Sequence, residues 1–235
     1  MRRVNHAGAE VSLLGGPALV ALAGAGTLLA PGLSRRARAA SIVALLGGGA
    51  AGLYDDVREH RHAPGKGLRG HLDALVSGNV TSGAVKAVGL AATGVGVARV
   101  LFRAPVDVFL GAAIVAGEAH LANLFDLRPG RCLKFALLRA ALPPGPGSTG
   151  MSVAAATMLA LDLRERTMLG DCGANALGAA LGAAALVRLR SRAGRIAHLA
   201  TVLSVIAAGE GRSFSDIIAA DPVLSWLDAF GRPAR

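Results

Sequence analysis

The sequence predicts an all-α, polytopic membrane protein with about eight transmembrane helices, forming one domain over residues 1–235. The first supporting observation is composition, because 53% of the residues are hydrophobic and 17% are charged, against about 25% charged in soluble domains. The second is that the apolar residues fall in runs that approach the roughly 20 residues needed to cross a bilayer. The third is the spacing of small residues four apart, as at Gly48 and Gly52, which lets helices pack closely in lipid.

Eight apolar runs predict the spans in chain order. They are residues 12–31, 39–54, 80–100, 105–124, 131–143, 150–164, 172–189 and 194–209. The fifth and sixth runs are short and are separated by prolines and glycines at 143–147, so we expect a broken or re-entrant pair there. Residues 213–230 alternate apolar and charged side chains, which favours an interfacial helix at the C-terminal end over a ninth span.

The positive charge of the chain has two possible meanings. Lys and Arg number 25 against 15 Asp and Glu, a formal net charge of +10 that would suit a nucleic-acid-binding protein. The basic residues, however, lie in short clusters between apolar runs, and one Trp, one Tyr and six Phe provide few rings for stacking on bases. We therefore interpret the charge as loop charge of a membrane protein and expect no nucleic-acid partner.

The acidic residues predict which end of the spans is active. With the N-terminus inside, Lys and Arg are modestly enriched in the inner loops, as expected for a multi-pass protein of the plasma (inner) membrane. Asp107 is the only acidic residue expected on the outer side. The inner side receives most of the others: Asp55, Asp56, Glu59, Asp126, Asp171, Glu210 and Asp216. This asymmetry predicts an active face toward the cytoplasm.

The second predicted span ends on an adjacent acidic pair, Asp55-Asp56. Neighbouring carboxylates at a membrane boundary are unfavourable unless a metal ion or a cationic group compensates their charge. A basic loop with spaced glycines follows at residues 65–70 and contains Lys66, an arrangement that suits phosphate groups. A solvated helix end would explain one aspartate, but it explains the pair and its basic loop less well.

A polar stripe lies at the inner end of the fourth predicted span. His120, Asn123 and Asp126 are three residues apart, so they share one face of a helix, and Glu118 precedes them. Ionisable groups inside a span are candidates for function. A lone His or Glu would more often be a structural group with internal hydrogen bonds, but three polar residues on one stripe favour the functional interpretation.

An aspartate between glycines opens the seventh predicted span, in the sequence Gly170-Asp171-Cys172-Gly173. An aspartate at this position can serve as a helix N-cap, because its side chain accepts a backbone N–H. It can also hold Mg²⁺ while neighbouring N–H groups bind a phosphate oxygen. The two interpretations are compatible, and the residues alone leave both open.

The three motifs, in this order and on one expected face, resemble the polyprenyl-phosphate N-acetylhexosamine-1-phosphate transferase family, and the chain resembles a short, divergent member. Asp55-Asp56 and Lys66-Gly67-Leu68 resemble the family's Asp-Asp pair and its later Lys-Gly-Leu. The family's Asn-x-x-Asp-Gly-x-Asp-Gly motif is resembled by residues 123–130, and its Met-Gly-Asp-x-Gly-Ser-Leu motif is resembled by Gly170-Asp171-Cys172-Gly173. This chain departs from them at Leu127, Pro129 and Ala174, where the family has Gly, Asp and Ser.

The resemblance implies transfer of a sugar-1-phosphate, of the N-acetylhexosamine type, from a UDP-sugar to polyprenyl (undecaprenyl) phosphate. UMP leaves, and Mg²⁺ is the cofactor. Asp171 would be the metal ligand, and Asp55, Asp56 and Asp126 would be the catalytic carboxylates. Substrate binding would fall to Lys66, His120, Asn123 and Gly173. The expected partners are the polyprenyl phosphate, the UDP-sugar, the lipid bilayer and a second copy in a homodimer, with a role in cell-wall (peptidoglycan) biogenesis.

Other functions remain open from the sequence. The main alternative is a catalytically degenerate homologue that binds polyprenyl phosphate or serves as a scaffold in cell-envelope synthesis. The enzyme is favoured because a chain that had lost catalysis would not be expected to keep Asp55, Asp56, Asp126 and Asp171 together. Transport along a polar path through Glu118 and His120 is disfavoured, because the charges gather at one surface and not through the membrane midplane.

Overall fold

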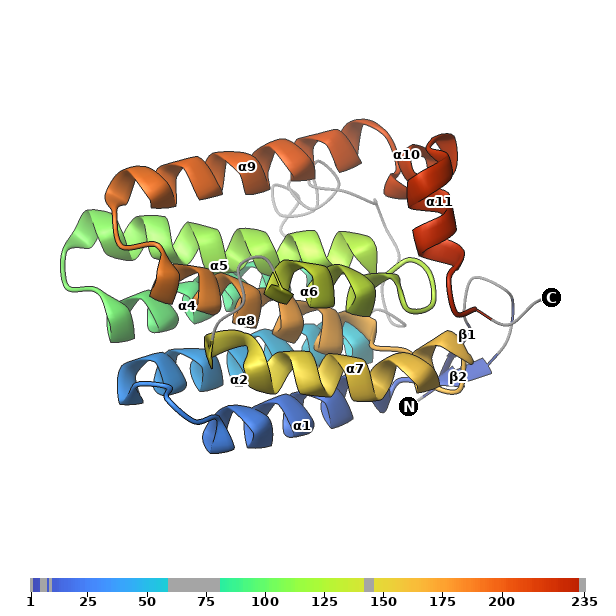
Figure 1. The fold of residues 1–235 in the computed structure, drawn as a ribbon, viewed down its shortest axis with the longest axis horizontal. Helices are drawn as coiled ribbons and strands as arrows, with labels where there is room; N and C mark the ends of the chain where they lie inside the picture. Colours follow the sequence, from blue (N-terminus) through green and yellow to red (C-terminus); the bar gives the residue numbers. More distant parts are fainter. Residues whose placement is uncertain (1, 5–7, 9, 59–80, 142–145, 233–235) are drawn as a thin grey trace.

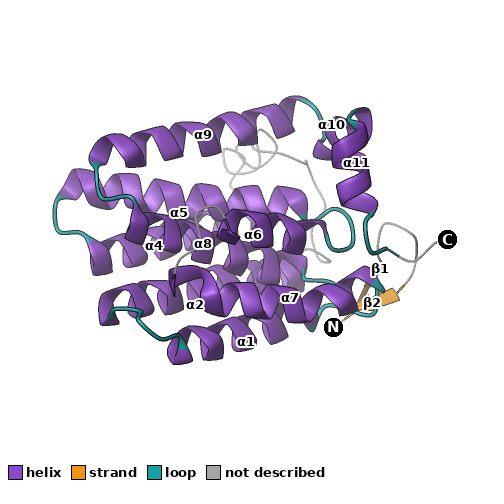
Figure 2. Cartoon of the chain, in the orientation of Figure 1, coloured by secondary structure: helices purple, strands orange, loops and turns teal. Residues whose placement is uncertain are grey.

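The computed structural model describes residues 2–4, 8, 10–58, 81–141 and 146–232. Within these ranges the chain is a bundle of helices with one small hairpin, so the all-α prediction is confirmed (Figures 1 and 2). The hairpin pairs strand β1 (Arg2–Val4) antiparallel with β2 (Glu10–Ser12), with Arg3 opposite Val11. It lies at the end of the bundle where the candidate site is found.

The described helices occupy every predicted apolar run. In chain order they are α1 (Gly15–Leu29), α2 (Arg35–Arg58), α4 (Ser82–Leu101), α5 (Pro105–Phe125), α6 (Arg131–Ala141), α7 (Thr149–Leu163), α8 (Gly170–Arg188), α9 (Arg192–Gly211), α10 (Phe214–Ala220) and α11 (Pro222–Ala229). A short 3₁₀ turn, η2 (Pro146–Ser148), precedes α7.

Four helices, α2, α4, α5 and α8, are long and apolar enough to cross a membrane. Two further apolar helices, α1 and α7, have 15 residues each, and α6 has 11, so these are shorter than a bilayer requires. Helix α9 has 20 residues, but Arg192, Arg195 and His198 lower the hydropathy of its first half. The helices thus indicate a membrane protein, while eight full spans are not confirmed.

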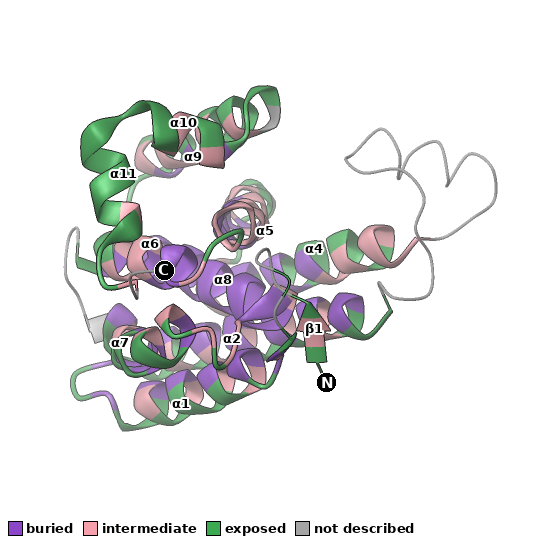
Figure 3. Cartoon of the chain, turned by 90° about the vertical axis from the view of Figure 1, so that its right-hand side faces the viewer, coloured by how far each residue is buried: buried purple, intermediate pink, exposed green. Residues whose placement is uncertain are grey.

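Helix α8 forms the centre of the bundle and is buried along nearly its whole length (Figure 3). Its sequence consists mainly of Ala, Gly and Leu, so neighbouring backbones approach it closely. A side-chain carbon on Gly178 would lie 2.2 Å from the Glu118 carbonyl oxygen of α5. This packing explains the small-residue spacing in the sequence and fixes α8 against α2 and α5.

The C-terminal segment consists of two short helices in place of the single predicted helix over 213–230. The break falls at Asp221-Pro222, where the Asp221 carboxylate accepts hydrogen bonds from the N–H groups of Val223 and Leu224, each at 2.9 Å. Helix α10 is anchored by the buried ring of Phe214, which stacks on Phe125. Helix α11 is held by a two-point ion pair between Asp228 and Arg131 of α6, at 2.7 and 3.0 Å.

Candidate functional site

Three charged side chains from helices distant in sequence meet at one end of the bundle. The ammonium of Lys86 on α4 lies 2.5 Å from a carboxylate oxygen of Asp55 on α2 and 2.7 Å from one of Asp171 on α8. All three side chains are largely shielded, with exposed fractions of 17%, 9% and 18%. One cation therefore bridges two carboxylates, and this cluster of Asp55, Lys86 and Asp171 is called the acidic cluster below.

Asp56, next to Asp55, fixes the start of α8. Its two carboxylate oxygens accept the N–H groups of Asp171 and Cys172, at 3.1 and 2.9 Å, and Arg3 lies 3.6 Å away. The first N–H groups of a helix have no partner within the helix, and a carboxylate also suits the positive end of the helix dipole. Asp56, and not Asp171, thus caps α8, which leaves the Asp171 side chain available for the acidic cluster.

The close approach of α2 and α8 at this point depends on glycine. A side-chain carbon on Gly52 would lie 2.0 Å from the carbonyl oxygen of Asp171, so another residue there would drive the helices apart. Gly170 has a φ of +59°, a left-handed conformation that favours glycine. These two glycines allow the backbone of Asp171 to lie directly beside the helix that carries Asp55 and Asp56.

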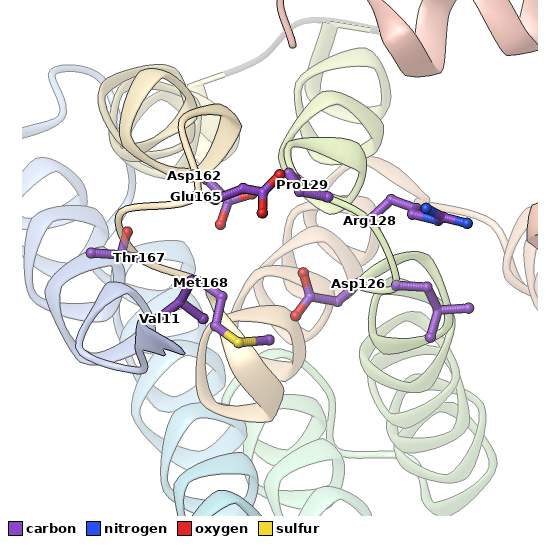
Figure 4. Close-up of a pocket in the computed structure, with 9 residues that line it drawn as sticks. Val11, Asp126, Arg128, Pro129, Asp162, Glu165, Thr167 and Met168 are labelled. Carbon is purple, nitrogen blue, oxygen red and sulfur yellow. The ribbon is translucent and has the colours of Figure 1, made fainter. Parts of the chain in front are cut away.

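Asp126 lies at the edge of a neighbouring pocket, at the C-terminal end of α5 (Figure 4). Its carboxylate points into the hollow between the α5–α6 and α7–α8 connections. Burial raises the pKa of Asp126 well above its usual value, and the charges of Asp162, Asp171 and Asp56 raise it further. Asp126 is therefore within electrostatic reach of the acidic cluster, and the Asp residues of all three motifs gather at one end of the molecule.

The opposite wall of the pocket is supplied by the end of α7 and the residues after it. Asp162 is 5% exposed and accepts the N–H of Gly130 at 2.6 Å, next to Pro129, where the family motif has an aspartate. Glu165 lies on the same wall and has a φ of +54°, the only positive φ of a non-glycine residue in the described chain. Two carboxyl groups from α7 and its following loop thus stand near the position where the sequence motif lacks one.

The other predicted binding residues have different surroundings. Asn123 is half-buried on the last turn of α5, where its carbonyl oxygen accepts the N–H of Asp126, and His120 is one turn earlier. Gly173 is buried against Gly16 of α1, so close helix packing accounts for this glycine. Lys66 lies outside the described residues.

Lys86 is the main residue of the site that the sequence analysis did not single out. It is the only lysine of α4 and lies in an apolar stretch of that helix, in the sequence Gly83-Ala-Val-Lys86-Ala. An ionisable residue inside a predicted span is a functional candidate by default, and it usually faces a partner of opposite charge. That signal was present, but the sequence does not identify which carboxylates the lysine would meet.

The site offers oxygen ligands of the type that Mg²⁺ prefers, although no group of three or more His, Cys, Asp or Glu side chains among the described residues is arranged to hold a metal. Mg²⁺ is commonly bound through one or two carboxylates, with waters and substrate phosphates completing its shell. Asp55 and Asp171 reach a common cation, the Lys86 ammonium. Their chemistry and mutual placement therefore fit such an ion.

A second ionic cluster lies deeper in the bundle. Glu118 on α5 is fully buried and accepts hydrogen bonds from Arg139 on α6 and from His198 on α9, the latter at 2.9 Å. Both bonds go to one carboxylate oxygen, and the other, Oε2, has no hydrogen-bond partner within the described chain. This Glu118 cluster links α5, α6 and α9.

Comparison with known proteins finds no matching family model and no similar curated protein.

Proposed function

We propose that the protein transfers a sugar-1-phosphate, of the N-acetylhexosamine type, from a UDP-sugar to polyprenyl phosphate. A phosphate oxygen of the lipid attacks the β-phosphorus of the UDP-sugar, the bond from that phosphorus to UMP breaks, and UMP leaves. The proposal places the reaction at the cytoplasmic face of the plasma membrane, in cell-envelope synthesis. It also includes eight membrane passages, the shorter apolar helices among them.

The observation that carries the proposal is the meeting of Asp55 and Asp171 on one cation. These residues come from the first and third motifs of the resembled family and are separated by about half of the chain, yet one ammonium contacts both. Asp126, from the second motif, is close enough for its pKa to respond to the charge of Asp171. A solvated helix end would not require this convergence of three motifs.

The proposed roles follow from the surroundings of each side chain. Asp171 is the leading metal ligand, because its backbone is fixed by Asp56 while its carboxylate faces the shared cation. Asp55 assists at the metal and orients the lipid phosphate. The pocket beside Asp126 takes the diphosphate or nucleotide of the donor, and Asn123, on the last turn of α5, assists in binding it. When bound, Mg²⁺ would neutralise phosphate charge, which is a large part of phosphoryl-transfer catalysis.

Lys86 has two roles in the proposed reaction. Without substrate, its ammonium neutralises the two carboxylates of the acidic cluster. With a phosphate present, the same ammonium is placed to offset phosphate charge, since lysine binds phosphate as a compact point charge. The resemblance assigned phosphate binding to Lys66, and in this proposal Lys86 shares that role.

The interfacial position of the C-terminal segment is part of the proposal. Helix α11 has no buried residue, and its apolar side chains Val223 and Trp226 are exposed next to the site end of the bundle, as is Phe230 directly after the helix. A short amphipathic helix with exposed tryptophan and phenylalanine suits the boundary between headgroups and acyl chains. There it would border the entry of a lipid-linked substrate.

One observation favours the degenerate homologue as a second candidate. The Lys86 ammonium occupies the space between Asp55 and Asp171, so the two carboxylates already have a counter-ion. A protein that retained this ion pair for stability alone would bind polyprenyl phosphate, or assemble with partners, without transferring a sugar.

The test incubates the purified chain with undecaprenyl phosphate, Mg²⁺ and a panel of UDP-sugars, and measures UMP release. We expect release with at least one UDP-sugar and a loss of about a hundredfold or more in Asp171→Asn, because the main metal ligand is weakened. Asp216→Asn, on exposed helix α10, is the matched control and should retain activity. Absence of UMP release with every sugar, together with Mg²⁺ binding unchanged in Asp171→Asn, would leave the degenerate homologue as the function.

A further inference from the structure

The end of the bundle opposite the acidic cluster carries a concentration of exposed arginines. Three connections meet there: α1–α2, α4–α5 and α8–α9 (Figure 1). They present Arg35 and Arg36 at the start of α2, Arg99 and Arg103 around the end of α4, and Arg190 between α8 and α9. All five side chains are exposed, and none has an ion pair or hydrogen bond among the described residues. These five residues are called the arginine end below.

The acidic residue available at this end is already used. Among the described residues, Asp107, in the first turn of α5, is the only carboxylate at the three connections. Arg192 reaches it at 3.0 and 3.2 Å, and Arg195 reaches it at 2.8 Å. One carboxylate therefore faces two guanidinium groups, and within the described ranges no carboxylate remains to compensate the charge of the arginine end.

The same contacts hold two of the connections in place. The buried guanidinium of Arg195 donates to the carbonyl oxygens of Leu189 and Arg190, and it lies 4.7 Å from the ring centre of Phe102. Arg195 thereby links the α8–α9 connection to the α4–α5 connection. The backbone that carries the exposed arginines on either side is therefore held in place. Less conformational entropy is then lost when these residues bind a ligand.

The start of α2 adds to the positive potential. Arg35 and Arg36 lie in the first turn, where the helix dipole is positive and where this helix has no acidic residue. Arg38 is not available there, because it donates to the carbonyl oxygens of Thr27 and Ala30 at the end of α1. An anion at this position would relieve both the side-chain charge and the dipole.

We infer that the arginine end binds the phosphate headgroups of anionic phospholipids in the leaflet that surrounds it. The arginines lie at the ends of helices long enough to cross a membrane, which is the depth of the headgroups. Guanidinium groups bind phosphate through two parallel hydrogen bonds, and clustered basic residues at a membrane boundary attract anionic lipid. The inference depends on membrane insertion and is independent of the proposed transferase activity.

The test uses the purified full chain in micelles that contain equal amounts of phosphatidylglycerol and phosphatidylcholine, with retained lipids identified by native mass spectrometry. We expect the protein to retain phosphatidylglycerol in several-fold preference over phosphatidylcholine. In the triple variant Arg99→Gln, Arg103→Gln, Arg190→Gln, that preference should fall at least twofold. The corresponding Arg→Lys triple variant should retain most of it, since the charge remains.

A matched control removes three arginines from the other end of the molecule. Arg164, Arg166 and Arg212 are also exposed and have no side-chain partner among the described residues, but they lie where carboxylates are numerous. Their triple Arg→Gln variant should keep the lipid preference. An equal loss in this control, or no preference in the unmodified protein, overturns the inference. Binding of polyglutamate in place of phosphatidylglycerol, with the same dependence on the arginines, would overturn it in favour of an acidic protein partner.

Discussion

The acidic cluster and the Glu118 cluster use similar side chains in opposite proportions. In the acidic cluster, two carboxylates share one ammonium, and Asp56 and Asp126 add further carboxyl groups nearby. In the Glu118 cluster, one carboxylate receives an arginine and a histidine. The first cluster has an excess of anionic oxygen and lies next to a pocket, so it can accept a cation. The second cluster joins three helices, and its carboxylate is already paired with an arginine. The ratio of acid to base therefore distinguishes a candidate site from a structural link.

Removing the cation of the acidic cluster should give the largest effect on stability. In Lys86→Met, Asp55 and Asp171 would face each other without a counter-ion, and breaking a buried ion pair typically costs about 3–5 kcal/mol. Thermal unfolding in detergent should therefore occur at a clearly lower temperature. Added Mg²⁺ should restore much of the loss, because it replaces the ammonium between the carboxylates. A variant that is destabilised but insensitive to Mg²⁺ would contradict a cation site here.

Removing the acid of the Glu118 cluster should give a smaller effect, which Mg²⁺ does not reverse. Glu118→Ala leaves Arg139 and His198 without their carboxylate partner, but the Arg139 side chain is 31% exposed, so water can solvate its charge. We expect a loss of about 2–3 kcal/mol in the free energy of unfolding, measured by the same melts. Rescue by Mg²⁺ in this variant would erase the distinction between the two clusters.

The cap of α8 should contribute less than either cluster. Asp56→Ala removes the acceptor for the N–H groups of Asp171 and Cys172, and loss of a helix cap costs about 1–2 kcal/mol. Asp56→Asn keeps one side-chain oxygen and should cost less. UMP release should fall in the alanine variant more than stability alone explains, because Asp171 loses its fixed position. Equal activity in the two variants would show that the cap does not position Asp171.

The ion pair between Arg131 and Asp228 should produce the smallest effect, visible only in acid. Burial opposes ionisation of Asp228, but hydrogen bonds and charge from Arg131 and Arg232 outweigh it and lower the pKa of Asp228. A lowered pKa in the folded state means that the stabilisation is present above the ordinary value of about 3.9 and is lost as the pH falls below it. Fluorescence of Trp226, the only tryptophan, on α11 should report this release. In Asp228→Asn the acid transition should be absent.

The helices were predictable because their apolar runs are long and separated by clear breaks. The number of full spans was not, since the lengths of α1, α6 and α7 depend on where packing ends each helix. The acidic motifs were recognisable as candidates, but sequence spacing could not show that Asp56 caps α8 while Asp55 faces Lys86. The different roles of these adjacent residues depend on the angle at which α2 meets α8. For the same reason Lys86 and Asp162, which lie outside the motifs, could not be assigned to the site.

The contact between Gly52 and the backbone of Asp171 has a mechanical consequence. Because the two helix backbones touch there, the separation of the Asp55 and Asp171 backbones does not depend on side-chain rotamers. Lys86 belongs to α4, the least buried of the four long apolar helices. A displacement of α4 along the bundle would therefore withdraw the counter-ion while the two carboxylates kept their spacing.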